Sequence, residues 1–312
     1  MIEIRPIRKT EIALRSNLLN ENLHSADSLY SIEEEYPLVL SPANLDRSHV
    51  LVEKGHLIAH ANLLVRKLLK NKECAAKIGL IGNVTSDIAH RGKGYIRKLF
   101  NYFESIANSE SLDYLLLWSD LDEFYAKLGF VPVGRETRLA FHSDNFKNNV
   151  TRSNFKAKNI IGRNASELTS EELMKLISLR PKTPLELERE LSDFKKQVSI
   201  PDTYLVELKE NNDVSAYTFV GRGSDFIGVA YEWGFVPGKA SLLTDIISFI
   251  IHQTDLEQLL LIGPSNIPEM KELEKSASDV EETHMALAKK TNPQKKNDID
   301  WLESYIWGLD SI

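Results

Sequence analysis

The chain has 312 residues, of which 42% are hydrophobic and 27% are charged, and its formal net charge at pH 7 is −7. This acidic balance argues against nonspecific nucleic-acid binding, which requires a clustered basic surface. The single cysteine, Cys74, excludes an intramolecular disulfide bond and is typical of a reducing compartment. The length predicts two domains of about 150 residues each.

The N-terminal sequence MIEIRPIRK has no apolar signal core. The apolar run at residues 240–251 is interrupted by polar side chains, and it is shorter than the roughly 18 residues that a membrane-spanning helix needs. We therefore expect a cytoplasmic protein that has neither a membrane nor a nucleic acid as its partner.

Hydrophobic periodicity predicts the elements of the first half in chain order. They are a strand at 1–6, helices at 11–19 and 26–36, a hairpin of strands at 49–53 and 57–68, a strand at 78–85, a helix at 95–107, a strand at 114–118, a helix at 122–130 and a strand at 137–142. The last strand is expected to close the first unit. Polar residues 143–158 then form a linker or an irregular crossover.

The second half repeats this organisation. The segments LVEKGHLIAHANLLVR (51–66) and LVELKENNDVSAYTFVGR (205–222) share their ends and their alternation. The further predictions are two helices within 167–198, a hairpin of strands at 203–210 and 214–222, a strand at 226–233, a helix at 240–253, a strand at 256–262, a helix at 267–278, a strand at 283–288 and a terminal helix at 298–308. The repeated order predicts an internal duplication into domains 1–145 and 155–312, unless the likeness of the hairpins is accidental.

A glycine-rich, cationic turn lies between the strand at 78–85 and the helix that begins at Tyr95. Gly92 and Gly94 allow an anion to approach the backbone, while Arg91 and Lys93 supply positive charge beside the start of a helix. This arrangement predicts a phosphate-bearing ligand. The spacing fits neither a P-loop nor a dinucleotide-binding fingerprint.

Two motifs resemble the GNAT superfamily of N-acetyltransferases. The run Arg91-Gly92-Lys93-Gly94-Tyr95-Ile96 is similar to the acetyl-CoA loop [QR]-x-x-G-x-[GA] of that superfamily, and departs from it only at Ile96. About 30 residues further on, DEFYAKLGF (122–130) is similar to the FYxKxGF helix that follows the fifth strand of the family core. The resemblance implies a duplicated GNAT fold, which is a mixed-sheet α/β architecture.

The resemblance also implies the chemistry and the site. Acetyl-CoA is the expected co-substrate, with no metal, and an amine is expected to attack its carbonyl directly. The pantetheine chain is expected at Val84, Thr85 and Ser86, and the pyrophosphate on the amides of residues 91–96. By position, Tyr125 is the expected general acid that protonates the departing sulfur. The acceptor is expected to be a small-molecule amine or a peptide amine. The sequence does not decide whether the protein forms a homodimer.

Several neighbouring side chains have plainer interpretations. Tyr125 is either the acid or only a core aromatic, and Phe124 is expected in the core. Tyr95 is expected to pack or to form a wall beside the adenine. His90 and Lys127 are expected at the surface.

The sequence assigns no general base. The acidic run 33–35 either forms a solvated helix face or holds a cationic amine. Asp87, Asp120 and Asp122 are expected near the cleft, and a chain of water molecules is a further alternative.

Where the second half should carry its own loop, it reads EWGFVPGKA (232–240), in which the arginine is missing and Pro237 removes an amide donor. No FYxKxGF motif follows. We therefore predict a non-catalytic second domain. The alternative for the whole chain is a non-catalytic acyl-CoA-binding regulatory protein, which Ile96 favours and Tyr125 opposes.

Overall fold

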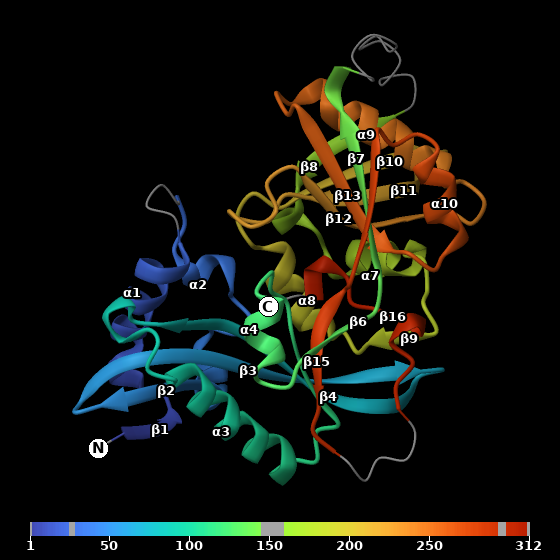
Figure 1. Ribbon diagram of the computed structural model, residues 1–312. Helices are drawn as coiled ribbons and strands as arrows, with labels where there is room; N and C mark the ends of the chain where they lie inside the picture. The colour runs from blue at the N-terminus through green and yellow to red at the C-terminus, as the bar shows by residue number, and fades with distance from the viewer. Residues whose placement is uncertain (1, 25–28, 145–158, 293–297, 311–312) are drawn as a thin grey trace.

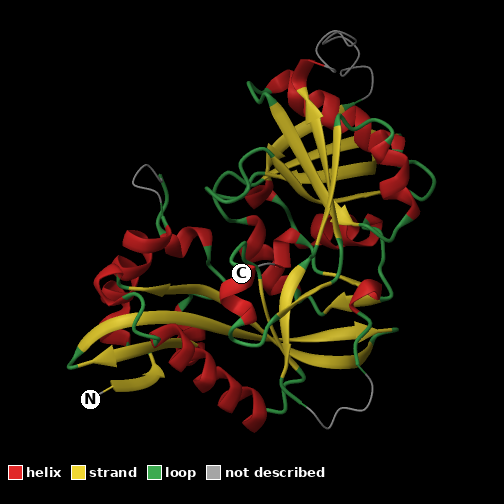
Figure 2. Ribbon diagram, viewed as in Figure 1, coloured by secondary structure: helices red, strands yellow, loops and turns green. Residues whose placement is uncertain are grey.

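The computed structural model describes residues 2–24, 29–144, 159–292 and 298–310. Two mixed β-sheets form two lobes, with helices packed on both faces of each sheet (Figures 1 and 2). The bounds of the helices are α1 (Ile12–Leu23), α2 (Ile32–Glu35), α3 (Tyr95–Ser109), α4 (Asp122–Ala126), α7 (Ser170–Leu179), α8 (Leu191–Val198), α9 (Ser241–Gln253) and α10 (Pro268–Glu274).

The first sheet has the strand order β1-β2-β3-β4-β5-β15-β6, and β9 and β16 extend it beside β3. Its strands are β1 (Ile2–Pro6), β2 (Ser48–Glu53), β3 (His56–Lys70), β4 (Glu73–Ser86), β5 (Tyr114–Leu117), β6 (Val131–Val133), β9 (Leu185–Leu187), β15 (Ala286–Lys290) and β16 (Ser304–Tyr305). The second sheet has the order β14-β7-β13-β12-β11-β10-β8. Its strands are β7 (Glu136–His142), β8 (Ile160–Asn164), β10 (Tyr204–Glu210), β11 (Asp213–Val220), β12 (Val229–Phe235), β13 (Gln258–Pro264) and β14 (Asp279–Thr283).

Both predicted hairpins are confirmed, and their turns have the backbone that two-residue hairpins require. Lys54 and Gly55 join β2 to β3 with φ values of 51° and 84°, and Asn211 and Asn212 join β10 to β11 with φ values of 51° and 67°. Turns with both central residues at positive φ match the right-handed twist of the flanking strands.

Each sheet contains strands from both halves of the chain: the second sheet includes β7 from the first half, and the first sheet includes β9, β15 and β16 from the second half. β7 was expected to close the first unit, but it lies in the second sheet between β13 and β14, with Leu139 opposite Leu261. β15, from the second half, lies in the first sheet between β5 and β6, with Leu287 opposite Leu117 (Figure 1). The prediction that 137–142 is a strand is therefore confirmed, and its expected place in the first sheet is wrong.

A continuous buried cluster connects the two sheets. It contains Leu80 and Leu116 of the first sheet together with Trp233 and Leu261 of the second. Trp307 of the C-terminal segment packs edge-on against Trp233, with ring centroids 5.2 Å apart. Because burial of apolar area is the main favourable term in folding, this shared cluster ties the two lobes together.

Two predicted helices differ from the structure. The terminal helix at 298–308 is wrong: a short 3-10 turn (Trp301–Glu303), capped by Asp300, leads into β16, which pairs in parallel with β9. The extended conformation buries Tyr305, Ile306 and Trp307 together between the lobes, which a helix would not do. Of the helix expected at 26–36, only α2 is helical, and residues 25–28 lie outside the described ranges.

Among the helices that the structure describes, none has the length and apolar character that crossing a lipid bilayer would require.

Candidate active site

The strands β4 and β5 pair in parallel over three residues only, in the middle of β4 and along most of the short β5. They pair from Ile78 opposite Tyr114 to Leu80 opposite Leu116, after which β4 continues to Ser86 while β5 ends at Leu117. The later part of β4 is thus paired on one side only, with β3. Its other edge presents backbone groups to any extended chain that lies between the two strands.

A β-bulge marks the place where β4 leaves β5. His60 of β3 pairs with Thr85, and Asn62 pairs with Gly82, so that β4 has one residue more than β3 in this interval. The extra residue is accommodated at Asn83, whose φ is 48°. Bulges redirect backbone groups and are over-represented beside active sites.

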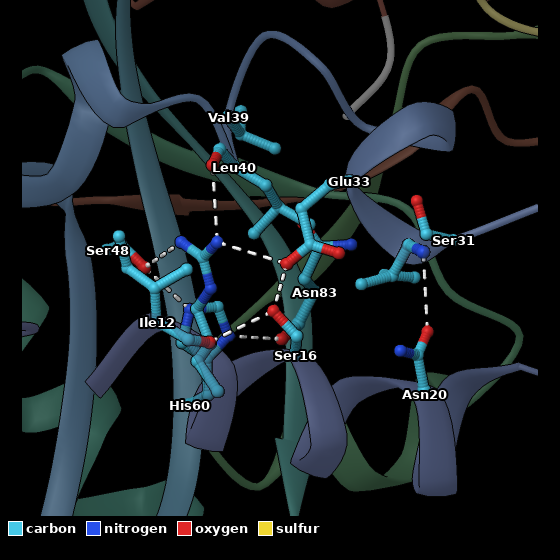
Figure 3. A network of polar contacts seen from close by, with 12 residues as sticks. Ile12, Ser16, Asn20, Ser31, Glu33, Val39, Leu40, Ser48, His60 and Asn83 are labelled. Atoms are coloured by element: carbon cyan, nitrogen blue, oxygen red, sulfur yellow. Dashed lines mark hydrogen bonds and ion pairs between the residues drawn. The ribbon is translucent and has the colours of Figure 1, made fainter. Parts of the chain in front are cut away.

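A buried chain of hydrogen bonds holds this bulge from the face that α1 covers (Figure 3). Nδ1 of His60 lies 3.1 Å from the carbonyl oxygen of Asn83, and Nε2 lies 2.8 Å from the hydroxyl of Ser48. A carbonyl oxygen only accepts, so Nδ1 carries the proton and Nε2 accepts from Ser48. The Ser48 oxygen in turn accepts from Nη1 of Arg15 at 3.4 Å.

Burial keeps His60 neutral, because its side chain is fully buried and desolvation lowers its pKa to about 3. In this series of hydrogen bonds each residue therefore donates to the next: Arg15 to Ser48, Ser48 to His60, and His60 to Asn83.

The acidic run at the start of α2 is solvated only in part, since Glu34 is exposed, Glu33 is half-buried and Glu35 is buried. Glu33 accepts from Nη2 of Arg15 at 3.3 Å and from the hydroxyl of Ser16 (Figure 3). Glu34 completes a capping box with Ser31. Glu35 is 3% exposed, lies 2.5 Å from Nε2 of His24 and accepts from the backbone N–H of Ser224 in the second lobe at 2.6 Å. The solvated interpretation therefore fits Glu34, whereas Glu33 and Glu35 are held by neighbours within the fold.

The segment after β4 is ordered by Asp87. Its carboxylate accepts from the backbone N–H of Ala89 at 2.7 Å and lies 3.1 Å from Nδ1 of His90. These two bonds, that of His90 first, lower the pKa of Asp87. A carboxylate with a lowered pKa is a weak proton acceptor, so Asp87 is a poor candidate for the general base.

The glycines of the turn adopt conformations that other residues avoid. Gly92 and Gly94 have φ values of 78° and 75°, and a Cβ at either position would meet no atom within 4 Å. The turn is thus open on the side that the glycines face. The first hydrogen bond of α3 joins the N–H of Lys98 to the oxygen of Gly94 at 3.2 Å, so the amides of Tyr95, Ile96 and Arg97 precede it.

A pocket of about 220 Å³ lies between this turn and α4. It includes most of the predicted cofactor-binding residues: Ser86, Arg91, Gly92, Gly94, Tyr95 and Ile96. Val84 and Thr85 lie just before it on β4 and are half-buried and buried, and Lys93 is exposed beside it. The opposite wall is formed by Phe124, Lys127 and Leu128.

The side chains of the turn have partners on other elements. Nη2 of Arg91 donates to Oδ1 of Asn22 at 3.0 Å. Tyr95 is 7% exposed, and its hydroxyl donates to Glu53 at 2.8 Å, so the expectation that it packs is met.

Tyr125 lies in α4 among other aromatic rings. It is 6% exposed, and its ring centroid is 5.7 Å from that of Phe100 and 6.0 Å from that of Phe130. Burial raises the pKa of Tyr125 to about 12, against a smaller lowering by a hydrogen bond with Ser119. The phenol is therefore protonated at neutral pH. Phe124 was expected in the core, but it is 41% exposed and lines the pocket, because α4 turns Tyr125 inward instead.

The second half has a corresponding strand, turn and helix. Gly238, between β12 and α9, has a φ of 82°. Nζ of Lys239 donates to Glu210 at 2.5 Å, so this cation is paired within the protein.

Residues 3–133 match the model of the GNAT acetyltransferase domain family. The likeness to a GNAT acetyltransferase domain thus covers the first half of the chain. The matched residues contain both motifs described above and every element of the first sheet up to β6.

Solved structures with the same architecture superpose on almost the whole of this chain. A probable N-acyltransferase from Enterococcus faecalis superposes with a TM-score of 0.68 at 12% identity, over 93% of this chain and 73% of that one. A tandem GNAT protein from the clavulanic acid biosynthesis pathway gives 0.60 at 12% identity, over 95% and 100%. The N-myristoyltransferase of Saccharomyces cerevisiae, with bound myristoyl-CoA, gives 0.57 at 12% identity, over 96% and 87%. These likenesses show the duplicated GNAT fold.

A curated protein also matches in sequence, over a short segment. The large ribosomal subunit protein uL3 of Treponema denticola is 38% identical over 58 residues, which are 19% of this chain and 28% of that protein. Because the chain spans just over a quarter of that relative, the match carries no conclusion about activity.

Proposed function

We propose that this chain transfers an acetyl group from acetyl-CoA to a primary amine, with the reaction centred in the first sheet. The observation that carries the proposal is that the pairing of β4 with β5 ends at Leu80, while β4 continues toward a glycine-rich turn that lines a pocket at the start of α3. A GNAT fold supports acyl transfer from acyl-CoA to an amine in general; the acetyl group and the residues named below are our proposal.

The residues present fit the co-substrate. The open sides of Gly92 and Gly94 and the amides at the start of α3 suit a pyrophosphate, since a helix N-terminus favours negative charge. Arg91 and Lys93 add positive charge there. The one-sided edge of β4 at Val84, Thr85 and Ser86 suits the amide groups of an extended pantetheine chain.

The chemistry then needs little more than positioning and proton transfer. Acetyl-CoA supplies the thioester carbonyl that the amine attacks, so that a C–N bond forms and the C–S bond breaks. Tyr125 gives its hydroxyl proton to the departing sulfur, a role that its protonated state at neutral pH allows. The acceptor ammonium gives one proton to a base before the attack, and the second proton that its nitrogen loses when the amide forms restores the phenol of Tyr125.

A non-catalytic acyl-CoA-binding protein is the second candidate. Ile96 favours it, since this larger side chain lines the pocket where the family pattern has glycine or alanine. We propose the transferase because the protonated Tyr125 follows Phe124 in α4, and Phe124 lines this pocket. The second lobe is proposed as a non-catalytic partner domain, and the cytoplasm as the location.

Two matched glycine variants test the cofactor site. Gly94 and Gly55 both have positive φ, 75° and 84°, and a Cβ at either would meet nothing within 4 Å. Gly94→Ala and Gly55→Ala should therefore each lose about 1 kcal/mol of stability. Only Gly94→Ala should weaken acetyl-CoA binding in calorimetry, about tenfold or more, because only there does the Cβ meet a phosphate. Equal affinities in both variants would contradict the proposed site.

A further inference from the structure

A second and larger pocket, of about 440 Å³, lies between the two lobes. Trp118 and Tyr36 line it from the first lobe, and Phe226 and Ile262 from the second. The exchanged strand β7 contributes Glu136 and Arg138. Ligand pockets of a few hundred Å³ with an apolar lining and a few charged groups are typical of small-molecule sites.

This pocket lies on the face of the first sheet opposite the cluster that contains Tyr125. Along β5, Leu115 and Leu117 pack against the cluster under α3 that contains Tyr125. Leu116 and Trp118 face the other way, toward the cluster shared with the second lobe. Trp118 is adjacent in the chain to Ser119, which bonds with Tyr125. The two pockets therefore lie on opposite faces of the sheet at the carboxyl end of β5.

Two carboxylates face the inter-lobe pocket, and both are held in place. Oε1 of Glu136 accepts from Nε of Arg138 at 3.0 Å, and Oε2 accepts from the hydroxyl of Tyr305 at 2.9 Å. Asp225, on the other side of the pocket, accepts from the hydroxyl of Tyr36. Carboxylates fixed in this way on an aromatic-lined surface suit an ammonium group, which needs charged acceptors when it leaves water.

The pocket also has two arginines, which limit the charge of its ligand. Arg138 pairs with Glu136, and the buried Arg222 donates to the carbonyl oxygen of Gly308 at 3.0 Å. With two carboxylates and two guanidinium groups, the charged lining has no net charge. The further positive charges of a polycation would be repelled by these guanidinium groups with no additional carboxylate among the described lining residues to hold them, whereas a single ammonium group has the two carboxylates as partners.

We propose that this inter-lobe pocket is the acceptor site, and that it selects a primary amine with a single positive charge and an apolar body. The proposal rests on the proposed transferase function. It assigns Glu136 and Asp225 to the ammonium group, and it gives the second lobe a direct part in acceptor binding.

The experiment uses the full chain with phenethylamine as the probe. Calorimetric titration in the presence of CoA gives its dissociation constant, and thiol release from acetyl-CoA gives KM and kcat. Asp225→Asn and Glu136→Gln should each weaken phenethylamine binding and raise its KM about tenfold or more, with the KM for acetyl-CoA changed less than about twofold. Asp255→Asn, which removes an exposed carboxylate beyond α9, is the matched control and should change neither.

Spermidine, which carries several positive charges, should bind at least tenfold more weakly than phenethylamine. Phenethylamine binding that is absent, or that survives unchanged in both variants, would overturn the inference, as would tighter binding of spermidine. Failure of acetyl-CoA to bind the unaltered chain would instead overturn the proposed function. In that case, the calorimetric titration with phenethylamine still tests whether the inter-lobe pocket binds an amine.

Discussion

At the scale of single residues, the bulge in β4 depends on a histidine that must stay uncharged. His60 accepts from Ser48 and donates to the carbonyl of Asn83, and a second proton on its ring would remove the acceptor that Ser48 needs. His49, next to Ser48 in β2, is also buried, and desolvation lowers its pKa to about 4. Both imidazoles are therefore neutral in the folded chain over a range where exposed imidazoles become charged.

We predict that acid destabilises the protein through these two histidines. Their pKa values in the fold, about 3 for His60 and about 4 for His49, lie below the ordinary value of 6.5. The unfolded chain therefore binds more protons below about pH 6.5. Above that pH, the neutral rings make their full contribution to the free energy of unfolding. As the pH falls from about 6.5 toward the pKa values in the folded protein, this contribution decreases by about 1.4 kcal/mol per pH unit for each ring.

Urea unfolding between about pH 7 and pH 5 measures this slope. His60→Gln, which keeps a polar side chain but does not titrate, should reduce the slope by about one ring's share. His56→Gln, at an exposed position of the same strand, should leave it unchanged. A slope that is identical in the unaltered chain and in His60→Gln would show that His60 does not titrate as described.

At the scale of elements, the exchange of β7 and β15 decides how the lobes are joined. Each sheet contains an internal strand, next to the strand at one edge, that the other half of the sequence supplies. Neither sheet can keep all its ladders if the halves separate, since the neighbours of the lost strand would present unpaired edges. A division of the chain into residues 1–145 and 155–312 therefore does not separate the two sheets, because each sheet contains strands from both parts.

A protease site placed within residues 145–158 tests this joining. After cleavage, the two fragments should elute together in size-exclusion chromatography at the position of the uncut chain, because each supplies a strand to the other. Denaturing electrophoresis confirms that the cut is complete. Separate elution under native conditions, with each fragment still folded, would contradict the exchanged topology.

Local sequence patterns predicted most of these elements. They failed for segments whose conformation or sheet depends on contacts with residues far away in the sequence. The hairpin that turns at Lys54-Gly55 and the helix that begins at Tyr95 depend on nearby residues, and both are present as expected. The alternation at 137–142 predicts a strand, but it fits either sheet equally well, so it does not say which one. The terminal segment carries aromatic residues whose burial depends on both lobes, and its extended form overrides the helical spacing.

The site was predictable to the same extent. The turn at 91–96 is contiguous, and its residue types alone indicate an anion site at a helix start. The inter-lobe pocket combines Trp118, Glu136 and Asp225 from segments that are far apart in the sequence, so no local pattern could indicate it. Phe124 and Tyr125 are neighbours in a short helix, and only the packing of α4 decides which of them faces inward.

At the scale of the whole molecule, the two lobes behave as one packed body. The shared hydrophobic cluster crosses between them, and ion pairs add to it: Arg66 with Asp193 and Lys70 with Glu303, each at 2.5 Å. A deeply buried pair anchors the C-terminal segment, since Arg189 donates to both Glu232 and Asp310.

We therefore predict one cooperative thermal transition rather than two. In scanning calorimetry, the calorimetric enthalpy should equal the van't Hoff enthalpy, as expected when no intermediate with one unfolded lobe accumulates. Two resolved transitions, or a van't Hoff enthalpy near half of the calorimetric one, would mean that the lobes unfold independently.

The most direct test of the central claim is the release of free thiol from acetyl-CoA in the presence of primary amines, compared between the unaltered chain and Tyr125→Phe. The account predicts turnover with an amine acceptor, a kcat about 100-fold or more lower in the variant, and an unchanged affinity for acetyl-CoA. Full activity in Tyr125→Phe would show that Tyr125 is not the general acid. An unaltered chain that binds acetyl-CoA but transfers it to no amine would favour the non-catalytic alternative, and one that does not bind acetyl-CoA would contradict the central claim.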